Sequence, residues 1–179
     1  LNREIKKNYQ IKGTINKAKF NIFNQVEIDN LNLSFNISNN QLTLSKIETD
    51  LNSIKLKSPL IKIEEKKNIF FINGKVINDQ QNFDISKLKP ILGDLLNNIE
   101  IEKIDFNSVN TFSFNVNKKL KLNDLKLETN INLENFEIVK NPLNLKYFLP
   151  NYTEQVKFED HKIKIKLTKD ILDIKGDGD

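Results

Sequence analysis

The sequence contains no cysteine and no methionine. Without cysteine, the chain has neither a disulfide framework nor thiol chemistry, which is compatible with cytosol and periplasm alike. Since it begins at Leu1 and has no methionine, we expect it to be an excerpt of a longer chain. No stretch approaches the roughly 18 apolar residues of a membrane-spanning helix, and no charged-then-apolar signal precedes the fold. Any anchor or signal is therefore expected outside this segment.

Arginine is almost absent, because Arg3 is the sole example in a chain of net charge +4. The positive charge comes from lysines interspersed with aspartate and glutamate. Proteins that read nucleic acid rely on arginine forks and clustered basic patches. The lysine-rich positions are better interpreted as a solvated sheet face, and we expect no nucleic-acid partner.

Groups for catalysis and metal binding are equally scarce. His161 is the only histidine, no acid or nucleophile constellation accompanies it, and it is expected in a turn at His161-Lys162. One histidine without cysteine cannot supply a zinc site, and Asp173, Asp177 and Asp179 lack the spacing of an EF-hand. The five glycines are scattered and form no phosphate-binding loop. The sequence predicts no enzyme, no metal and no cofactor.

What the chain does contain is alternation of apolar and polar residues. Leu31, Leu33, Phe35 and Ile37 occupy every second position, and alternation resumes after a polar Ser38–Gln41 break. A period of two on both sides of a polar tip predicts a β-hairpin that turns at Asn39-Asn40.

The same pattern returns farther along, at a period of about 79 residues. Phe35 corresponds to Phe114, and Leu42 and Leu44 correspond to Leu120 and Leu122. We interpret this as two repeat copies, at about 9–84 and 100–138, within a single β-rich segment 1–179. The expected concave apolar surface comprises Leu33, Phe35, Ile37, Leu42, Leu44, Phe112, Phe114, Val116, Leu120 and Leu122.

Elsewhere the apolar residues shift repeatedly between odd-numbered and even-numbered positions, which we call a change of parity. Each change needs an interpretation. We expect a bulge at Asp29-Asn30 and a kink or sheet edge at Pro59. Two short strands each are expected within 9–23 and within 100–117, where the alternation breaks. Phe70 and Phe71 are both apolar, so 69–76 is expected to be buried on both faces.

One segment has a different period. Leu88, Ile91, Leu92, Leu95, Leu96 and Ile99 follow steps of three and four, which predicts one short amphipathic helix near 86–98 joining the repeat copies. The fold expected overall is mainly β: a curved, taco-like antiparallel repeating β-groove with this helix over one end. A closed β-sandwich, in which a second sheet covers the apolar face, is the alternative.

The repeated hairpins, the strands SPLIKIE (58–64) and KIKIKLTKDILDIKGDGD (162–179), and the helix between repeats resemble the AsmA-like superfamily. Its relatives include TamB/YhdP-type proteins of Gram-negative envelopes. The resemblance implies a periplasmic β-groove, anchored to the inner membrane by a segment not included here. It also implies lipid transport toward the outer membrane during outer membrane biogenesis, with envelope proteins at the groove ends.

Physical chemistry is consistent with that role. Each buried CH₂ of an acyl chain contributes about 0.8 kcal/mol, so a groove lined by Leu, Ile and Phe can hold phospholipid acyl chains without polar contacts. Because no hydrogen-bonding cluster is evident on the apolar face, the energy along the groove is expected to be nearly flat. The alternative function is a structural or adhesive envelope module built as a closed sandwich.

Overall fold

The computed structural model describes residues 9–22, 26–79, 100–140, 156–169 and 171–177. These ranges are occupied almost entirely by strands. The strands are β1 (Gln10–Ile22), β2 (Val26–Ser38), β3 (Gln41–Leu51), β4 (Ile54–Lys66), β5 (Ile69–Asn78), β6 (Glu100–Asn117), β7 (Leu122–Lys140), β8 (Val156–Thr168) and β9 (Ile171–Asp177).

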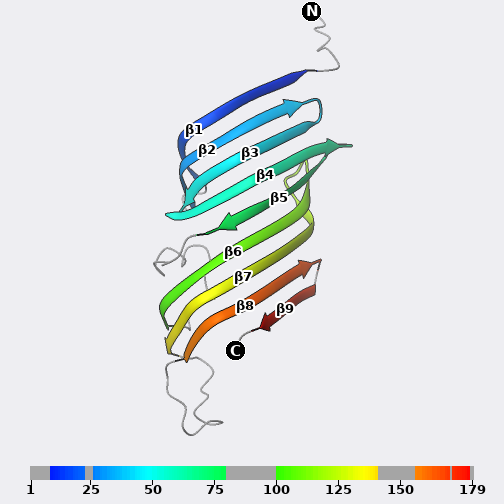
Figure 1. The fold of residues 1–179 in the computed structure, drawn as a ribbon. Coiled ribbons are helices and arrows are strands. Elements are labelled where there is room, and N and C mark those ends of the chain that lie inside the picture. Colours follow the sequence, from blue (N-terminus) through cyan, green and yellow to red (C-terminus); the bar gives the residue numbers. More distant parts are fainter. Residues whose placement is uncertain (1–8, 23–25, 80–99, 141–155, 170, 178–179) are drawn as a thin grey trace, which may run out of the picture.

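All of these strands form one open antiparallel sheet whose spatial order is the order of the sequence (Figure 1). The edges of the sheet are therefore β1 and β9. The mainly β prediction is confirmed at this level, and so is the hairpin at Asn39-Asn40, because Ser38 pairs with Gln41. The β3–β4 and β4–β5 turns are also two residues long, and both central residues of each have positive φ. Such turns match the twist of the flanking strands.

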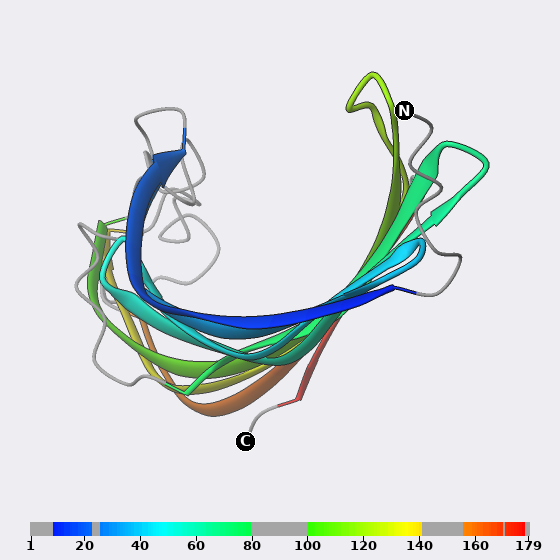
Figure 2. The same ribbon diagram turned by 90° about the horizontal axis from the view of Figure 1, so that it is seen from above.

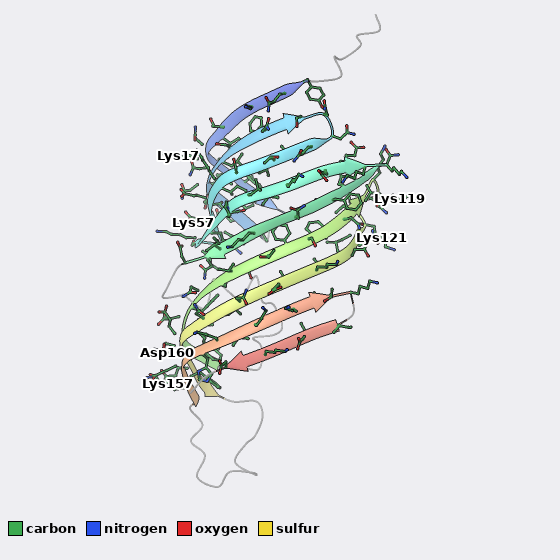
Figure 3. The ribbon with its side chains drawn as sticks, turned by 45° about the vertical axis from the view of Figure 1, so that its right-hand side comes forward. Lys17, Lys57, Lys119, Lys121, Lys157 and Asp160 are labelled. Carbon is green, nitrogen blue, oxygen red and sulfur yellow. The ribbon has the colours of Figure 1, made fainter. Side chains whose placement is uncertain are left out.

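Each long strand bends along its length, so the ribbon is U-shaped when the sheet is viewed from above (Figure 2). Left-handed residues inside the strands mark the bends. Lys17, Asn30, Lys46 and Asp160 have φ of 53°, 52°, 54° and 51°. Figure 3 shows Lys17 and Asp160 along the same margin of the sheet, one toward the β1 edge and the other toward the β9 edge. Irregularities of this kind bend a strand without ending it.

A bulge also reverses the parity of the residues that follow it. In β3, Leu42 and Leu44 precede Lys46, whereas Ile47 and Leu51 follow it and lie on the same face of the sheet. The predicted bulge at Asp29-Asn30 is confirmed by a register shift between Asp29 and Asn32. Pro59 lies inside β4, which pairs with both β3 and β5, so the predicted sheet edge is wrong. The predicted kink is correct, because the register between β4 and β5 shifts between Lys57 and Ile61.

Three expected breaks are wrong for the same reason. Residues 10–22 form one strand rather than two, and residues 100–117 form the single strand β6. His161 is not in a turn but within β8, where it pairs with Leu133 of β7. Within 10–22 and near His161 the apolar residues change parity, whereas within 100–117 the polar residues Ser108 and Asn110 interrupt the alternation without a change of parity. At each point the hydrogen-bonded ladder to the neighbouring strand continues.

The chain exposes more surface than a compact protein of the same mass. The accessible surface is 13392 Å² for a mass of 20.9 kDa, whereas a compact monomer of that mass exposes about 9,000 Å². Among the described residues, the buried hydrophobic side chains are Ile47, Ile54 and Leu133. Phe71 remains 39% exposed beneath the Lys66 ammonium, so 69–76 is not buried on both faces. A single sheet without a covering layer leaves its side chains in this half-buried state.

The helix predicted near 86–98 lies outside the described residues. Within the described ranges there is no helix. None of the described residues belongs to a helix long and apolar enough to cross a membrane.

Candidate apolar binding face

One row of apolar or glycine residues crosses the entire sheet. Each member is paired in register with the next, from edge to edge of the sheet. The row consists of Gly13, Phe35, Leu44, Ile61, Gly74, Phe112, Leu127, Leu167 and Leu172. Because paired residues project to the same side of a sheet, this row defines one face, the apolar face, and the residues alternating with it define the polar face.

The two glycines of the row make room for aromatic rings. A Cβ atom at Gly74 would lie 2.8 Å from Phe112 Cζ and 2.9 Å from Ile61 Cγ1. A Cβ atom at Gly13 would overlap the ring of Phe35 in the same way. A phenylalanine ring lying over a cross-strand glycine keeps the strand covered where glycine itself has no side chain.

Most of the predicted site residues come together on this face. Phe35 pairs with Leu44, and Ile37 pairs with Leu42, as expected for the first hairpin. The predicted residues of the second hairpin do not pair with those of the first hairpin, because β4 and β5 lie between them and connect the two sets. The links are Ile63 with Ile72, Ile72 with Phe114, Gly74 with Phe112, and Phe70 with Val116. The rings of Phe112 and Phe114 stack with centroids 5.9 Å apart.

Of the remaining predicted residues, Leu33 and Leu122 pair with residues of the apolar face, whereas Leu120 does not. Leu33 pairs with Ile15 of β1. Leu120 is not on a strand but in the turn before β7, where it is 83% exposed with φ of 58°. Figure 3 shows its neighbours Lys119 and Lys121 at the margin of the sheet opposite to that of Lys17, at the other end of the strands. Leu122 pairs with Val116 but is 49% exposed. The second hairpin thus has a longer turn than the first, and Leu120 does not occupy the position of Leu42.

The apolar face contains a cavity of about 490 Å³, here called the apolar cavity. Ile54 of β4 packs there against Leu56 and against Ile104 and Phe106 of β6. Leu133 of β7 completes its buried part. None of the described residues that line this cavity is charged.

Four uncharged polar side chains also line the apolar cavity, and sequence reasoning missed them. They are Asn78 of β5, Ser108 and Asn110 of β6, and Thr129 of β7, here called the polar cluster. Asn78, Ser108 and Thr129 are all buried. The expectation of an apolar face without a hydrogen-bonding cluster is therefore wrong. The signal was the interruption of alternation at Ser108 and Asn110, which we had interpreted as a break between strands.

The polar face carries a second hollow, of about 610 Å³, lined in part by Lys75, Lys126, Glu128 and Lys166. The Glu128 carboxylate accepts a hydrogen bond from Lys164 Nζ at 2.7 Å, and Lys166 Nζ lies 3.8 Å away. The hydrogen bond from Lys164 lowers the pKa of Glu128 below its ordinary value. In β8 the lysines are exposed and the alternating Ile163, Ile165 and Leu167 are half-buried, as the pattern predicts.

The His161 ring contacts an aromatic ring and a backbone carbonyl oxygen of its own strand. It meets the edge of the Phe158 ring at a centroid distance of 5.4 Å, and its Nδ1 lies 2.6 Å from the Glu159 carbonyl oxygen. The described residues contain no group of three or more His, Cys, Asp or Glu side chains placed to hold a metal ion.

Comparisons of the chain with protein-family models, with curated proteins and with solved structures found no significant match.

Proposed function

We propose that this chain is a segment of a periplasmic β-groove protein that carries phospholipid between the inner and outer membranes of a Gram-negative bacterium. In this proposal the bent sheet is the groove, its apolar face holds the acyl chains, and its polar face contacts water. The protein is anchored to the inner membrane by a segment outside this chain, and envelope proteins adjoin the groove ends.

The observation that carries the proposal is the unbroken apolar row from β1 to β9. Such a row is expected to be buried, yet the strands that would cover it are not found among the described ranges, which form a single sheet. Exposed apolar surface of this extent is typical of a binding face. The closed-sandwich alternative requires a second sheet packed about 10 Å from the first.

The chemistry of the apolar face favours an acyl chain over other occupants. The side chains of its row are hydrocarbon, and the apolar cavity has no charged side chain in the part of its lining that the structure describes. A hydrocarbon occupant gains about 0.8 kcal/mol per buried CH₂. The resemblance of the hairpins to the AsmA-like superfamily supports phospholipid as the source of that chain.

The test is photo-crosslinking in the natural protein. A photoreactive residue at position 44 or 114 should form an adduct with co-purifying phospholipid. The matched control positions are Thr43 and Ser113, which precede these residues on the same strands and pair with Lys62 and Lys126 on the polar face. Absence of an adduct from both 44 and 114 would favour the sandwich module.

A charge should block passage only on the apolar face. We expect Leu44→Glu and Phe114→Asp to abolish envelope integrity, because a carboxylate in an apolar groove costs several kcal/mol unless it protonates. Thr43→Glu and Ser113→Asp, which place the same charge beside lysines on the polar face, should leave integrity unchanged. Intact transport in folded Phe114→Asp protein would contradict the proposal.

A further inference from the structure

The polar cluster is centred on Asn110. Its amide nitrogen donates to the Val76 carbonyl at 3.3 Å and to Ser108 Oγ at 3.1 Å. Its amide oxygen accepts from Thr129 Oγ1 at 2.9 Å. Asn78 pairs with Ser108 across the β5–β6 ladder, and its amide nitrogen donates to the Phe106 carbonyl. Side chains of three adjacent strands thus hold Ser108 and Thr129 in fixed orientations.

The cluster has hydrogen-bonding capacity left over. Ser108 Oγ accepts from Asn110, but among the described residues its own hydroxyl hydrogen has no acceptor. Thr129 Oγ1 is used as a donor and keeps its acceptor capacity. The two hydroxyl-bearing residues are only 6% and 8% exposed, and both line the apolar cavity. A buried hydroxyl hydrogen without an acceptor costs free energy that a ligand oxygen can recover.

The chemistry of the cavity restricts that ligand oxygen. None of the described residues that line the cavity is charged, so a phosphate or a carboxylate placed there would lose its hydration without gaining a counter-charge from them. An ester carbonyl is neutral, accepts hydrogen bonds, and is attached directly to a hydrocarbon chain. That chain would continue along Ile54, Phe106 and Leu133, which line the same cavity.

We infer that the polar cluster binds the ester linkage of an acyl lipid, with Ser108 Oγ donating to the ester carbonyl oxygen. This inference rests on the proposed function and adds to it. The groove then has a preferred position at which an acyl ester stops, instead of uniform affinity along its length. It also distinguishes acyl esters from ethers and hydrocarbons of equal length.

The test compares two probes that differ only at the linkage. The full chain is titrated with a diacyl phospholipid and with the dialkyl ether analogue that has the same headgroup and chain lengths, and each affinity is measured. We expect the wild-type chain to bind the ester about fivefold more tightly, the ratio expected for one hydrogen bond. This ratio requires no variant, so it does not depend on how any substitution folds.

The variants assign the preference to the cluster. Ser108→Ala should lower ester affinity about fivefold while leaving ether affinity unchanged, which brings the ratio to about one. The matched control is Thr111→Val, which alters a hydroxyl on the same strand but on the polar face, where it is exposed. It should leave both affinities unchanged.

The outcomes separate the two proposals. Equal affinity of the wild-type chain for ester and ether, with both bound, would overturn the ester site and leave the lipid groove standing. An ester preference that persists in folded Ser108→Ala protein would overturn the ester site as well. If neither probe binds, both proposals fail.

Discussion

The two faces of this sheet each carry a hollow, and the larger hollow is the less suited to a lipid. The polar-face hollow measures about 610 Å³ and has Lys75, Lys126, Lys166 and Glu128 among its lining residues, whereas the apolar cavity measures about 490 Å³ and has no charged side chain among its described lining residues. Residues of β4, β5, β6, β7 and β8 contribute to both hollows. Volume therefore does not indicate which hollow binds a lipid; the side chains that line it do.

The two faces also differ in how they are held together. On the polar face the interactions are exposed ion pairs such as Lys164 with Glu128, which contribute little because water and salt screen them. On the apolar face the interactions are ring packing over glycine and a buried hydrogen-bonded cluster. The stability of the sheet should therefore depend far more on the apolar face than on the polar face. Three substitution experiments test this difference, beginning with the largest expected effect.

The largest effect is expected from a charge in the apolar cavity. Leu133 is buried there, so Leu133→Asp should lower the free energy of unfolding by about 3 kcal/mol or more. Urea denaturation followed by circular dichroism measures this change in the free energy of unfolding. The control is Asn130→Asp on the exposed polar face of the same strand, opposite Lys164, which should change it by less than about 0.5 kcal/mol. Similar losses in both variants would mean that the two faces are not different.

An intermediate effect is expected where an aromatic ring lies over a glycine. Gly74→Ala should lower the free energy of unfolding by about 1–3 kcal/mol, because the added methyl group would meet both Phe112 and Ile61. Gly176→Ala is the control, since a Cβ atom there has no neighbour within 4 Å. Adding Phe112→Leu to Gly74→Ala should recover part of the loss in urea denaturation. A double variant less stable than Gly74→Ala alone would contradict the ring-over-glycine explanation.

The smallest effect is expected on the polar face, at Glu128. Its pKa is lowered by Lys164, so the pair stabilises the fold above the ordinary carboxyl pKa of 4.5, and this contribution is lost as the pH falls below that value. Glu128→Gln should remove this pH dependence and otherwise change the thermal midpoint least of the three substitutions. The measurement is the midpoint at pH 7 and pH 3.5, at low and high salt. A variant that is as pH-dependent as the wild type would show that Glu128 is not the group responsible.

Local sequence alone was sufficient for the β character of the chain and for the face on which several of its apolar residues lie. A strand places alternate residues on opposite sides, so period-two alternation identified Phe35, Leu44, Phe112 and Phe114 as sharing a face. The turn at Asn39-Asn40 was predictable because asparagine tolerates the left-handed backbone that a tight hairpin needs. These features depend only on residues close together in the chain.

The parity changes could not be interpreted from the sequence. A change of parity is compatible with a turn that ends a strand and with a bulge that bends it. At Asp29-Asn30 the bulge interpretation was correct, whereas at His161 the turn interpretation was wrong. The difference lies in the partner strand: β8 continues through this point because β7 keeps pairing with it on both sides.

Composition and alternation by themselves determined that this chain forms an amphipathic antiparallel sheet. The tertiary structure decided how β4 and β5 join the two hairpins into one apolar row, and where the polar cluster lies. Asn78, Asn110 and Thr129 are far apart in sequence, and each looks like an ordinary interruption of a strand pattern. They line one cavity only because β5, β6 and β7 pair in a particular register, which no local pattern encodes.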